Sequence, residues 1–81
     1  MLEELKEASA KTVGLKQTLK VVQKGEAQVV FLARDVDDYV SKKVKEQCEK
    51  HNIPITFVDS MKELGEACGI EVGAATAAII K

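Results

Sequence analysis

The chain has 81 residues, of which 46% are hydrophobic and 31% charged, and its formal net charge at pH 7 is −1. These values are typical of a folded globular domain rather than a disordered segment, so we expect residues 1–81 to form a single domain. A domain of this size buries only about 60% of the surface of its unfolded chain. We therefore do not expect a large internal active-site cavity.

Aromatic residues and cysteines are too few for several kinds of site. Three aromatic residues, Phe31, Tyr39 and Phe57, do not suffice for a platform on which single-stranded bases stack. The two cysteines, Cys48 and Cys68, lie twenty residues apart, without a CxxC motif and with one histidine in the chain. We expect buried, reduced thiols, and no metal site, redox motif or cofactor. No apolar run reaches the roughly 18 residues of a membrane span, so the sequence predicts a cytoplasmic protein without a membrane partner.

The first half of the chain is predicted to contain two helices and two strands. Residues 2–9 place apolar residues at helical spacing and form a short helix, and Lys11–Val13 is a short strand. A second helix follows over residues 14–24 and is ended by Gly25. Residues 27–33, AQVVFLA, are mostly apolar and read as a strand covered on both faces, as in a largely parallel sheet.

The second half is predicted to continue the alternation. A helix extends over about residues 38–51 and ends before Pro54, and residues 55–58 form a short buried strand. Ser60, in an S-x-x-E capping box, begins a helix to about residue 68 that Gly69 closes. A loop and a final strand over residues 74–80 complete the chain. Strands that alternate with helices at this spacing predict an α/β/α sandwich.

The helix expected over residues 14–24 has an apolar stripe and a basic stripe. The apolar stripe comprises Leu15, Leu19 and Val22, and the polar stripe comprises Lys16, Gln17, Lys20 and Lys24. Residues 11–24 contain four lysines and no acidic residue, so the remainder of the chain, −1 less +4, carries −5. Two interpretations are open: a solvated lysine face, or a patch for phosphates and base edges. Charge alone favours the first, because exposed lysines are common on soluble helices. The missing acidic residues shift the balance toward the second, because surface helices commonly pair lysine with glutamate at i, i+4.

No catalytic site is indicated. Asp35, Asp37 and Asp38 precede a helix, a position in which capping is commoner than an acid/base or metal cluster. His51 lies in the last turn of that helix, where its charge favours the carbonyl end of the dipole. The five glycines match neither GxGxxG nor the phosphate-binding loop GxxxxGKS/T, so the nucleotide-binding fingerprints are absent.

The segment 70–75, IEVGAA, is a second unusual stretch. It places Ile70 and Val72 around one acidic residue, directly before a strand, with Gly73 free of side-chain bulk. In one interpretation Ile70 is the hydrophobic contact that accompanies a helix-ending glycine. In the other, the small apolar loop is a surface for an unstacked base.

Three segments carry a resemblance to a known family: GLKQTLKVVQKG at 14–25, ARDVDD at 33–38 and NIPITFVDSMKELGEACGIEVGAATAAII at 52–80. Together they resemble the kink-turn RNA-binding ribosomal-protein family, called L-seven-Ae, and are most similar to its small bacterial members of the YbxF type. The resemblance covers nearly the whole chain from about residue 10. It implies a three-layer α/β/α sandwich with a four-stranded mixed sheet, no catalysis, and binding to the kink-turn. That RNA element is a sharply bent helix with tandem sheared G·A pairs and an extruded nucleotide.

The resemblance also implies which residues meet the RNA. Gly14 would permit close approach of the backbone, Lys16 and Gln17 would face the guanines of the sheared pairs, and Lys20 would contact backbone or base edges nearby. The loop that would pack against the extruded nucleotide comprises Ile70, Glu71, Val72, Gly73, Ala74 and Ala75. Archaeal and eukaryotic relatives typically have Asn-Glu where this chain has Lys-Gln, which the bacterial members share. Glutamine can still accept through its amide oxygen, and lysine suits guanine O6 and N7.

Three functions follow as hypotheses. The first is a non-enzymatic, monomeric protein that binds kink-turn RNA and is associated with the ribosome or with another structured RNA. The second is a protein-interaction adaptor that uses the acidic remainder of the surface, for example the helix over residues 37–51. The third, an enzyme for a small phosphorylated ligand at the strand ends, has no catalytic residue that we can name.

Overall fold

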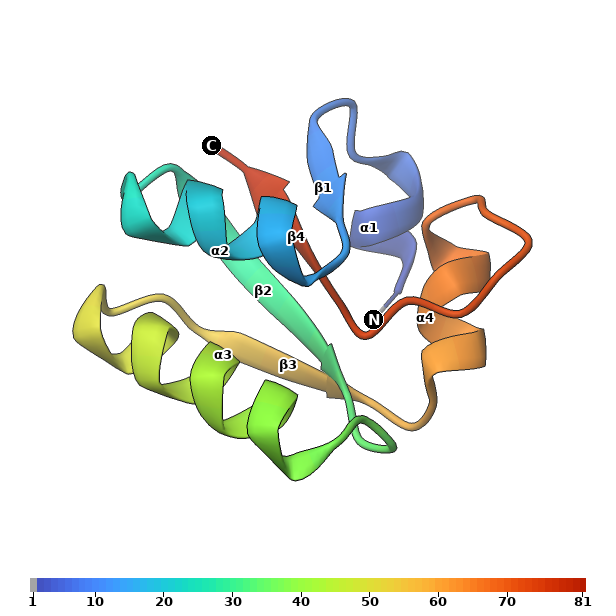
Figure 1. Cartoon of the computed structure of the whole chain (residues 1–81). Coiled ribbons are helices and arrows are strands. Elements are labelled where there is room, and N and C mark those ends of the chain that lie inside the picture. Colours follow the sequence, from blue (N-terminus) through green and yellow to red (C-terminus); the bar gives the residue numbers. More distant parts are fainter. Residues whose placement is uncertain (1) are drawn as a thin grey trace.

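The computed structural model describes residues 2–81, which form helices and strands in strict alternation (Figure 1). The elements are α1 (Glu3–Glu7), β1 (Lys11–Val13), α2 (Leu15–Gln23), β2 (Ala27–Ala33), α3 (Asp38–Lys50), β3 (Ile55–Val58), α4 (Met61–Ala67) and β4 (Thr76–Ile80). Each of them was predicted from the sequence. The final strand begins at Thr76 rather than Ala74, because the residues before it belong to the loop that leaves α4.

The four strands form one mixed sheet in the order β1-β4-β2-β3. β2 and β3 are parallel, whereas β4 lies between β1 and β2 and is antiparallel to both. The largely parallel sheet suggested by residues 27–33 is therefore wrong, since two of the three pairings are antiparallel, and the four-stranded mixed sheet that the resemblance implies is confirmed. The cause is the entry of β4 from the end of the sheet at which β1, β2 and β3 finish.

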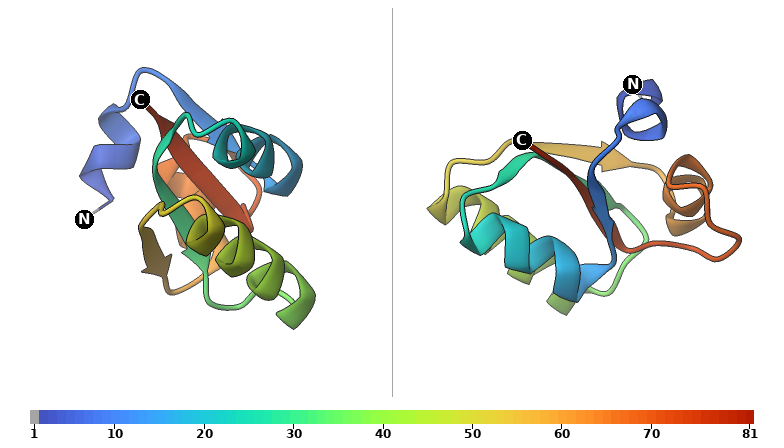
Figure 2. Two further views of the ribbon diagram at one scale, coloured as in Figure 1. Left: turned by 90° about the vertical axis from the view of Figure 1, so that its left-hand side faces the viewer. Right: turned by 90° about the horizontal axis from the view of Figure 1, so that it is seen from above.

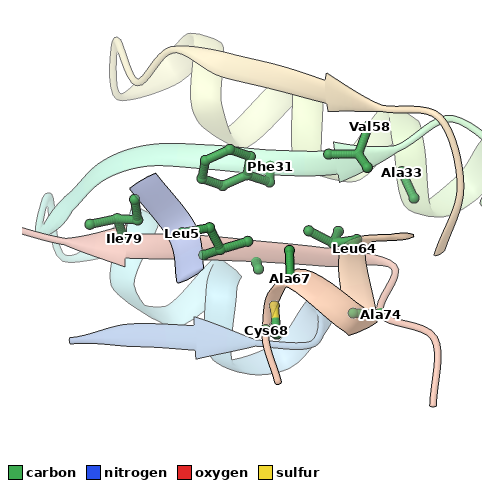
Figure 3. Close-up of a cluster of buried hydrophobic side chains, with 10 residues drawn as sticks. Leu5, Phe31, Ala33, Val58, Leu64, Ala67, Cys68, Ala74 and Ile79 are labelled. Carbon is green, nitrogen blue, oxygen red and sulfur yellow. The ribbon is translucent and has the colours of Figure 1, made fainter. Parts of the chain in front are cut away.

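Two helical layers cover the sheet, with α2 and α3 on one face and α1 and α4 on the other (Figure 2). The alternating side chains of β2 show why both faces are buried: Phe31 packs toward α1 and α4, and Val30 and Leu32 pack toward α2 and α3. Figure 3 shows the first of these clusters, in which Leu5 and Leu64 cover Phe31. The predicted three-layer sandwich is confirmed.

Both cysteines are buried, as predicted, one in each core cluster. Burial raises the pKa of the Cys48 thiol to about 11 and also raises the pKa of Cys68, because desolvation penalises the thiolate. Both thiols are consequently neutral at neutral pH and weak nucleophiles. None of the helices within residues 2–81 has the length and apolar character needed to cross a membrane.

The helix caps agree with the sequence at one site and differ at another. Ser60 Oγ accepts a hydrogen bond of 3.1 Å from Glu63 N, which confirms the predicted cap of α4. Asp37 holds the N-cap position of α3 without a side-chain cap bond, and Asp35 caps a different helix, because its Oδ1 accepts from Met61 N at 2.8 Å. The aspartates were expected to cap α3; instead, Asp35 joins the turn after β2 to the start of α4.

Candidate nucleic-acid interface

Segments far apart in the sequence meet at one end of the sheet, where β1, β2 and β3 finish and β4 begins (Figure 1). Gly14 N donates a hydrogen bond of 2.8 Å to Thr76 O, and Ala33 N donates one of 3.0 Å to Ala75 O. The start of α2 is thereby joined to the first residue of β4, and the end of β2 to the last residue of loop 70–75. Ligands of open α/β sheets commonly bind at the carboxyl ends of parallel strands.

Gly14 shapes the start of α2. Its backbone has φ 100° and ψ 159°, a conformation that is essentially restricted to glycine. A glycine N-cap also supplies no side-chain acceptor, and the first turn of α2 contains no acidic residue. The amide groups of that turn and the positive end of the helix dipole therefore favour an anion near this point. An added Cβ at Gly14 would meet open space, so glycine is required here by the backbone rather than by packing.

The polar residues of α2 are exposed and available to a partner. Lys16, Gln17 and Lys20 make no side-chain hydrogen bond or ion pair with any other residue in the described part of the chain. Lys16 and Lys20 are one turn apart and both line a groove toward α3. Gln17 points about 100° further round the helix than Lys16. The polar stripe was expected to act as one face, but Lys16 and Lys20 face the groove toward α3 and Gln17 faces another direction.

A pair of hydroxyl groups, one buried and one half-buried, fixes α2 against the sheet. Thr18 is fully buried, and its Oγ1 lies 2.9 Å from Thr12 Oγ1 of β1. Thr18 belongs to the same side of the helix as Leu15 and Val22, so the buried stripe contains a polar residue that the apolar pattern did not identify. Its hydrogen bond satisfies the hydroxyl and keeps the lysines on the outer side of α2.

The loop that follows α4 begins with a tight helix ending. Gly69, at φ 80°, donates to Glu66 O, and Ile70 N donates to Gly65 O, both at 3.0 Å, which is the Schellman arrangement. Ile70 is half-buried and packs against the core cluster on the α1 and α4 face. Of the two interpretations of this residue, the hydrophobic contact beside a helix-ending glycine is therefore present in the structure.

The rest of the loop is packed closely against α4. A Cβ added at Gly65 would overlap the Val72 carbonyl oxygen, and one added at Gly73 would lie 3.1 Å from Met61 Cβ. Ala74 N donates to Met61 O at 3.0 Å. Contacts with Met61 and Gly65 of α4 therefore hold the loop backbone in one position.

The loop offers a partner a short exposed segment. Glu71, Val72 and Gly73 are exposed, with Val72 71% exposed, and Ala75 is half-buried. Ala74 is 3% exposed, and Figure 3 shows its side chain within the buried cluster beside α4. Of the predicted loop residues, Ala74 can therefore present only backbone atoms to a ligand.

Arg34 is a candidate that the sequence reasoning did not single out. It follows β2 directly, at the same end of the sheet, and its side chain is 62% exposed. The guanidinium lies 5.0 Å from the centroid of the Phe57 ring, and Nε lies 3.8 Å from Asp59 Oδ1. Its position at the carboxyl end of a buried strand is the signal in the sequence that indicates it.

A metal centre has no evident place in residues 2–81, where no group of three or more histidine, cysteine or carboxylate side chains is arranged to hold an ion.

The site residues predicted from the sequence fall into two groups. Gly14, Lys16, Gln17 and Lys20 lie at the start of α2, and residues 70–75 lie between α4 and the start of β4, which Gly14 contacts.

Comparison with known proteins places this architecture in a family. A protein from Caldanaerobacter subterraneus subsp. tengcongensis named RNA-binding protein TTE2299 is 53% identical over 68 residues, which are 84% of this chain and 83% of that protein. RNA-binding protein YbxF of Geobacillus stearothermophilus is 43% identical over 79 residues, or 98% of this chain and 96% of that one.

A solved structure gives the same result for the fold. The 15.5 kD RNA-binding protein of Giardia lamblia superimposes with a TM-score of 0.87 at 30% identity, over 99% of this chain and 68% of the other. The family model described as ribosomal protein L7Ae/L30e/S12e/Gadd45 matches residues 1–81. The chain belongs to the ribosomal protein L7Ae/L30e/S12e/Gadd45 family.

Proposed function

We propose that this protein binds kink-turn RNA through the start of α2 and loop 70–75 and catalyses no reaction. One observation carries the proposal: the hydrogen bond from Gly14 N to Thr76 O joins the start of α2, with its unpaired lysines, to the strand that directly follows the exposed loop. The names of the relatives, which describe RNA-binding proteins, support an RNA partner. We further propose that the protein acts as a monomer in the cytoplasm.

The start of α2 supplies donors and an acceptor for base edges. Lys16 can donate to guanine O6 and N7, and the Gln17 amide oxygen can accept from a guanine amino group. Gly14 has no side chain to hold the RNA away from the first turn. Sheared G·A pairs expose these edges, whereas the narrow major groove of regular A-form RNA does not admit side chains.

Loop 70–75 supplies shape rather than charge. Val72 is an exposed apolar side chain on a backbone that α4 holds in place, and an extruded base offers a flat apolar face. Contact between the two would remove apolar surface from water on both sides. The loop would thus recognise the unstacked nucleotide that distinguishes a kink-turn from a straight duplex.

Electrostatics would provide a modest part of the affinity. If three lysines each neutralise one phosphate, a fourfold rise in salt concentration weakens binding about 40-fold, with the slope for duplex DNA as a stand-in. The remaining affinity must come from base and shape contacts. The ribosomal proteins in the family description make ribosomal RNA one natural source of such an element.

A gel-shift comparison tests this proposal. One RNA is a kink-turn duplex, and the other carries Watson-Crick pairs in place of the sheared G·A pairs. We expect clearly tighter binding to the kink-turn, because the second RNA lacks both the exposed guanine edges and the extruded nucleotide. Equal affinity for both RNAs would refute recognition of the kink-turn.

The adaptor hypothesis gains no comparable support. The relatives that resemble the whole chain are named for RNA rather than protein binding. The surface of α3 that was expected to be acidic carries Lys43 in the groove beside α2 and Lys42 in the hollow next to it. A pull-down with nuclease treatment separates the two functions, since an adaptor would keep its partners after RNA is digested.

A further inference from the structure

A basic groove lies between α2 and α3. It has a volume of about 310 Å³, and its lining residues are Lys16, Leu19, Lys20, Gln23 and Lys43. Three of these five residues are lysines and none is acidic. The two helices lie side by side on one face of the sheet, as both views in Figure 2 show. The groove therefore combines positive charge from two helices that are separate in the sequence.

The packing of the helices explains why the lysines converge. Val22 of α2 and Val44 of α3 are fully buried in the same core cluster. Lys43 precedes Val44 and so emerges at the border of that contact. On α2, Lys16 and Lys20 flank Leu19, which is 8% exposed and belongs to the same cluster.

The charges in the groove are not neutralised within residues 2–81. Lys16 and Lys20 have no side-chain partner there. Lys43 Nζ donates a bond of 3.3 Å to the Tyr39 hydroxyl and lies 5.5 Å from the centroid of that ring, but it meets no carboxylate. A second hollow of about 350 Å³ continues across α3 and shares Lys43. Its lining residues are Tyr39, Lys42, Lys43, Glu46 and Gln47. Clustered like charges in a concave surface raise the local potential for an anion.

We propose that the groove between α2 and α3 holds the phosphodiester backbone of the RNA, with Lys43 as a phosphate contact. This inference rests on the proposed function and extends its site, because Lys16 and Lys20 border both. Lysine ammonium groups suit phosphates as point charges and carry little base discrimination. The five residues that line the groove include no aromatic ring on which a base could stack. The groove thus adds affinity along the flanking RNA helix, and the start of α2 and loop 70–75 recognise the bend.

The test measures the affinity of Lys43→Ala for kink-turn RNA over a range of salt concentrations. We expect binding to weaken threefold to fivefold at about 0.1 M salt, and the slope of log affinity against log salt to fall by about one. The preference for the kink-turn over the Watson-Crick duplex should stay unchanged, because both RNAs have a backbone. Lys43→Arg should restore wild-type affinity.

A matched control separates this effect from a general loss of charge. Lys62→Ala removes the same charge from an exposed position on α4, in the opposite layer, and should leave the affinity unchanged. Lys43→Gln keeps a long polar side chain and should weaken binding as Lys43→Ala does, with an unaltered melting temperature. The two variants together distinguish loss of charge from loss of structure.

The possible failures are distinct. If Lys43→Ala and Lys62→Ala behave alike while the wild-type protein prefers the kink-turn, the groove does not bind the backbone, and the proposed function stands. If the wild-type protein binds both RNAs equally, kink-turn recognition falls. In that case, weaker binding of both RNAs by Lys43→Ala but not by Lys62→Ala would still support the groove as a backbone-binding site. A loss that Lys43→Arg does not restore would overturn the role of charge.

Discussion

The two parts of the candidate interface are built in different ways. The polar residues of α2 project from a helix whose opposite side is packed, and Lys16 and Lys20 make no hydrogen bond or ion pair with another side chain of residues 2–81. Loop 70–75 is held through its backbone, by bonds to Gly65 and Met61 and by the close approach of Val72 to Gly65. Affinity and stability should therefore be separable on α2 and coupled in the loop backbone.

This difference follows from the chemistry each part is proposed to perform. A lysine side chain is long, and rotation about its bonds lets the ammonium group reach a phosphate or base edge. It therefore needs little fixed structure around it. A small apolar surface for an extruded nucleotide has no long side chain with which to adapt. Its shape must be set beforehand, because ordering a flexible loop on binding would reduce the affinity.

The largest expected effect concerns the loop backbone. Gly65→Ala should lower the free energy of unfolding by about 3 kcal/mol, because the new Cβ would overlap the Val72 carbonyl oxygen and force the loop away from α4. Urea denaturation measures this loss. Kink-turn affinity should fall as well, even under conditions in which the variant is fully folded.

Glu66→Ala is the control for that change. Glu66 is an exposed neighbour on α4, and its replacement should alter the free energy of unfolding by no more than about 0.5 kcal/mol. A Gly65→Ala variant as stable as this control would show that the loop is not held as tightly as its contacts indicate, and the contrast with α2 would disappear.

The helices and strands could be predicted because their apolar spacing and capping residues lie close together in the sequence. The run over residues 27–33 is apolar on both sides of the strand, and it is buried on both faces. Ser60 and Glu63 lie three residues apart, so their cap could be read directly. The basic stripe of α2 likewise followed from helical spacing, whereas the RNA contacts expected of Lys16, Gln17 and Lys20 come from the family resemblance.

What could not be predicted depends on contacts between distant segments. The direction of β4 follows from where its loop enters the sheet, and Asp35 caps α4 because the turn after β2 lies beside it. Ala74 was expected both to begin the final strand and to be among the residues that meet the RNA, but the return of the chain to the sheet buries its side chain. The groove that contains Lys43 exists only because α2 and α3 pack together.

The next effect in size should separate affinity from stability on α2. Lys20→Ala should weaken RNA binding about fivefold, or ~1 kcal/mol, because one exposed cation is lost. Thermal melting should be unchanged, since Lys20 has no side-chain partner within residues 2–81 and alanine favours the helix. Lys62→Ala, with the same loss of charge on α4, is the control for a nonspecific electrostatic effect. A lower melting temperature for Lys20→Ala would mean that the α2 surface also supports the fold.

The smallest effect sharpens the comparison within the loop itself. Val72 is 71% exposed although its carbonyl group packs against Gly65, so its side chain and its backbone should behave differently. Val72→Ala should change the free energy of unfolding by less than about 0.5 kcal/mol and weaken kink-turn binding about threefold, because less apolar surface meets the extruded nucleotide. Binding to the Watson-Crick duplex, which has no extruded nucleotide, should not change. An equal loss with both RNAs would place Val72 against the backbone instead, and loop 70–75 would then contribute affinity without recognising the bend.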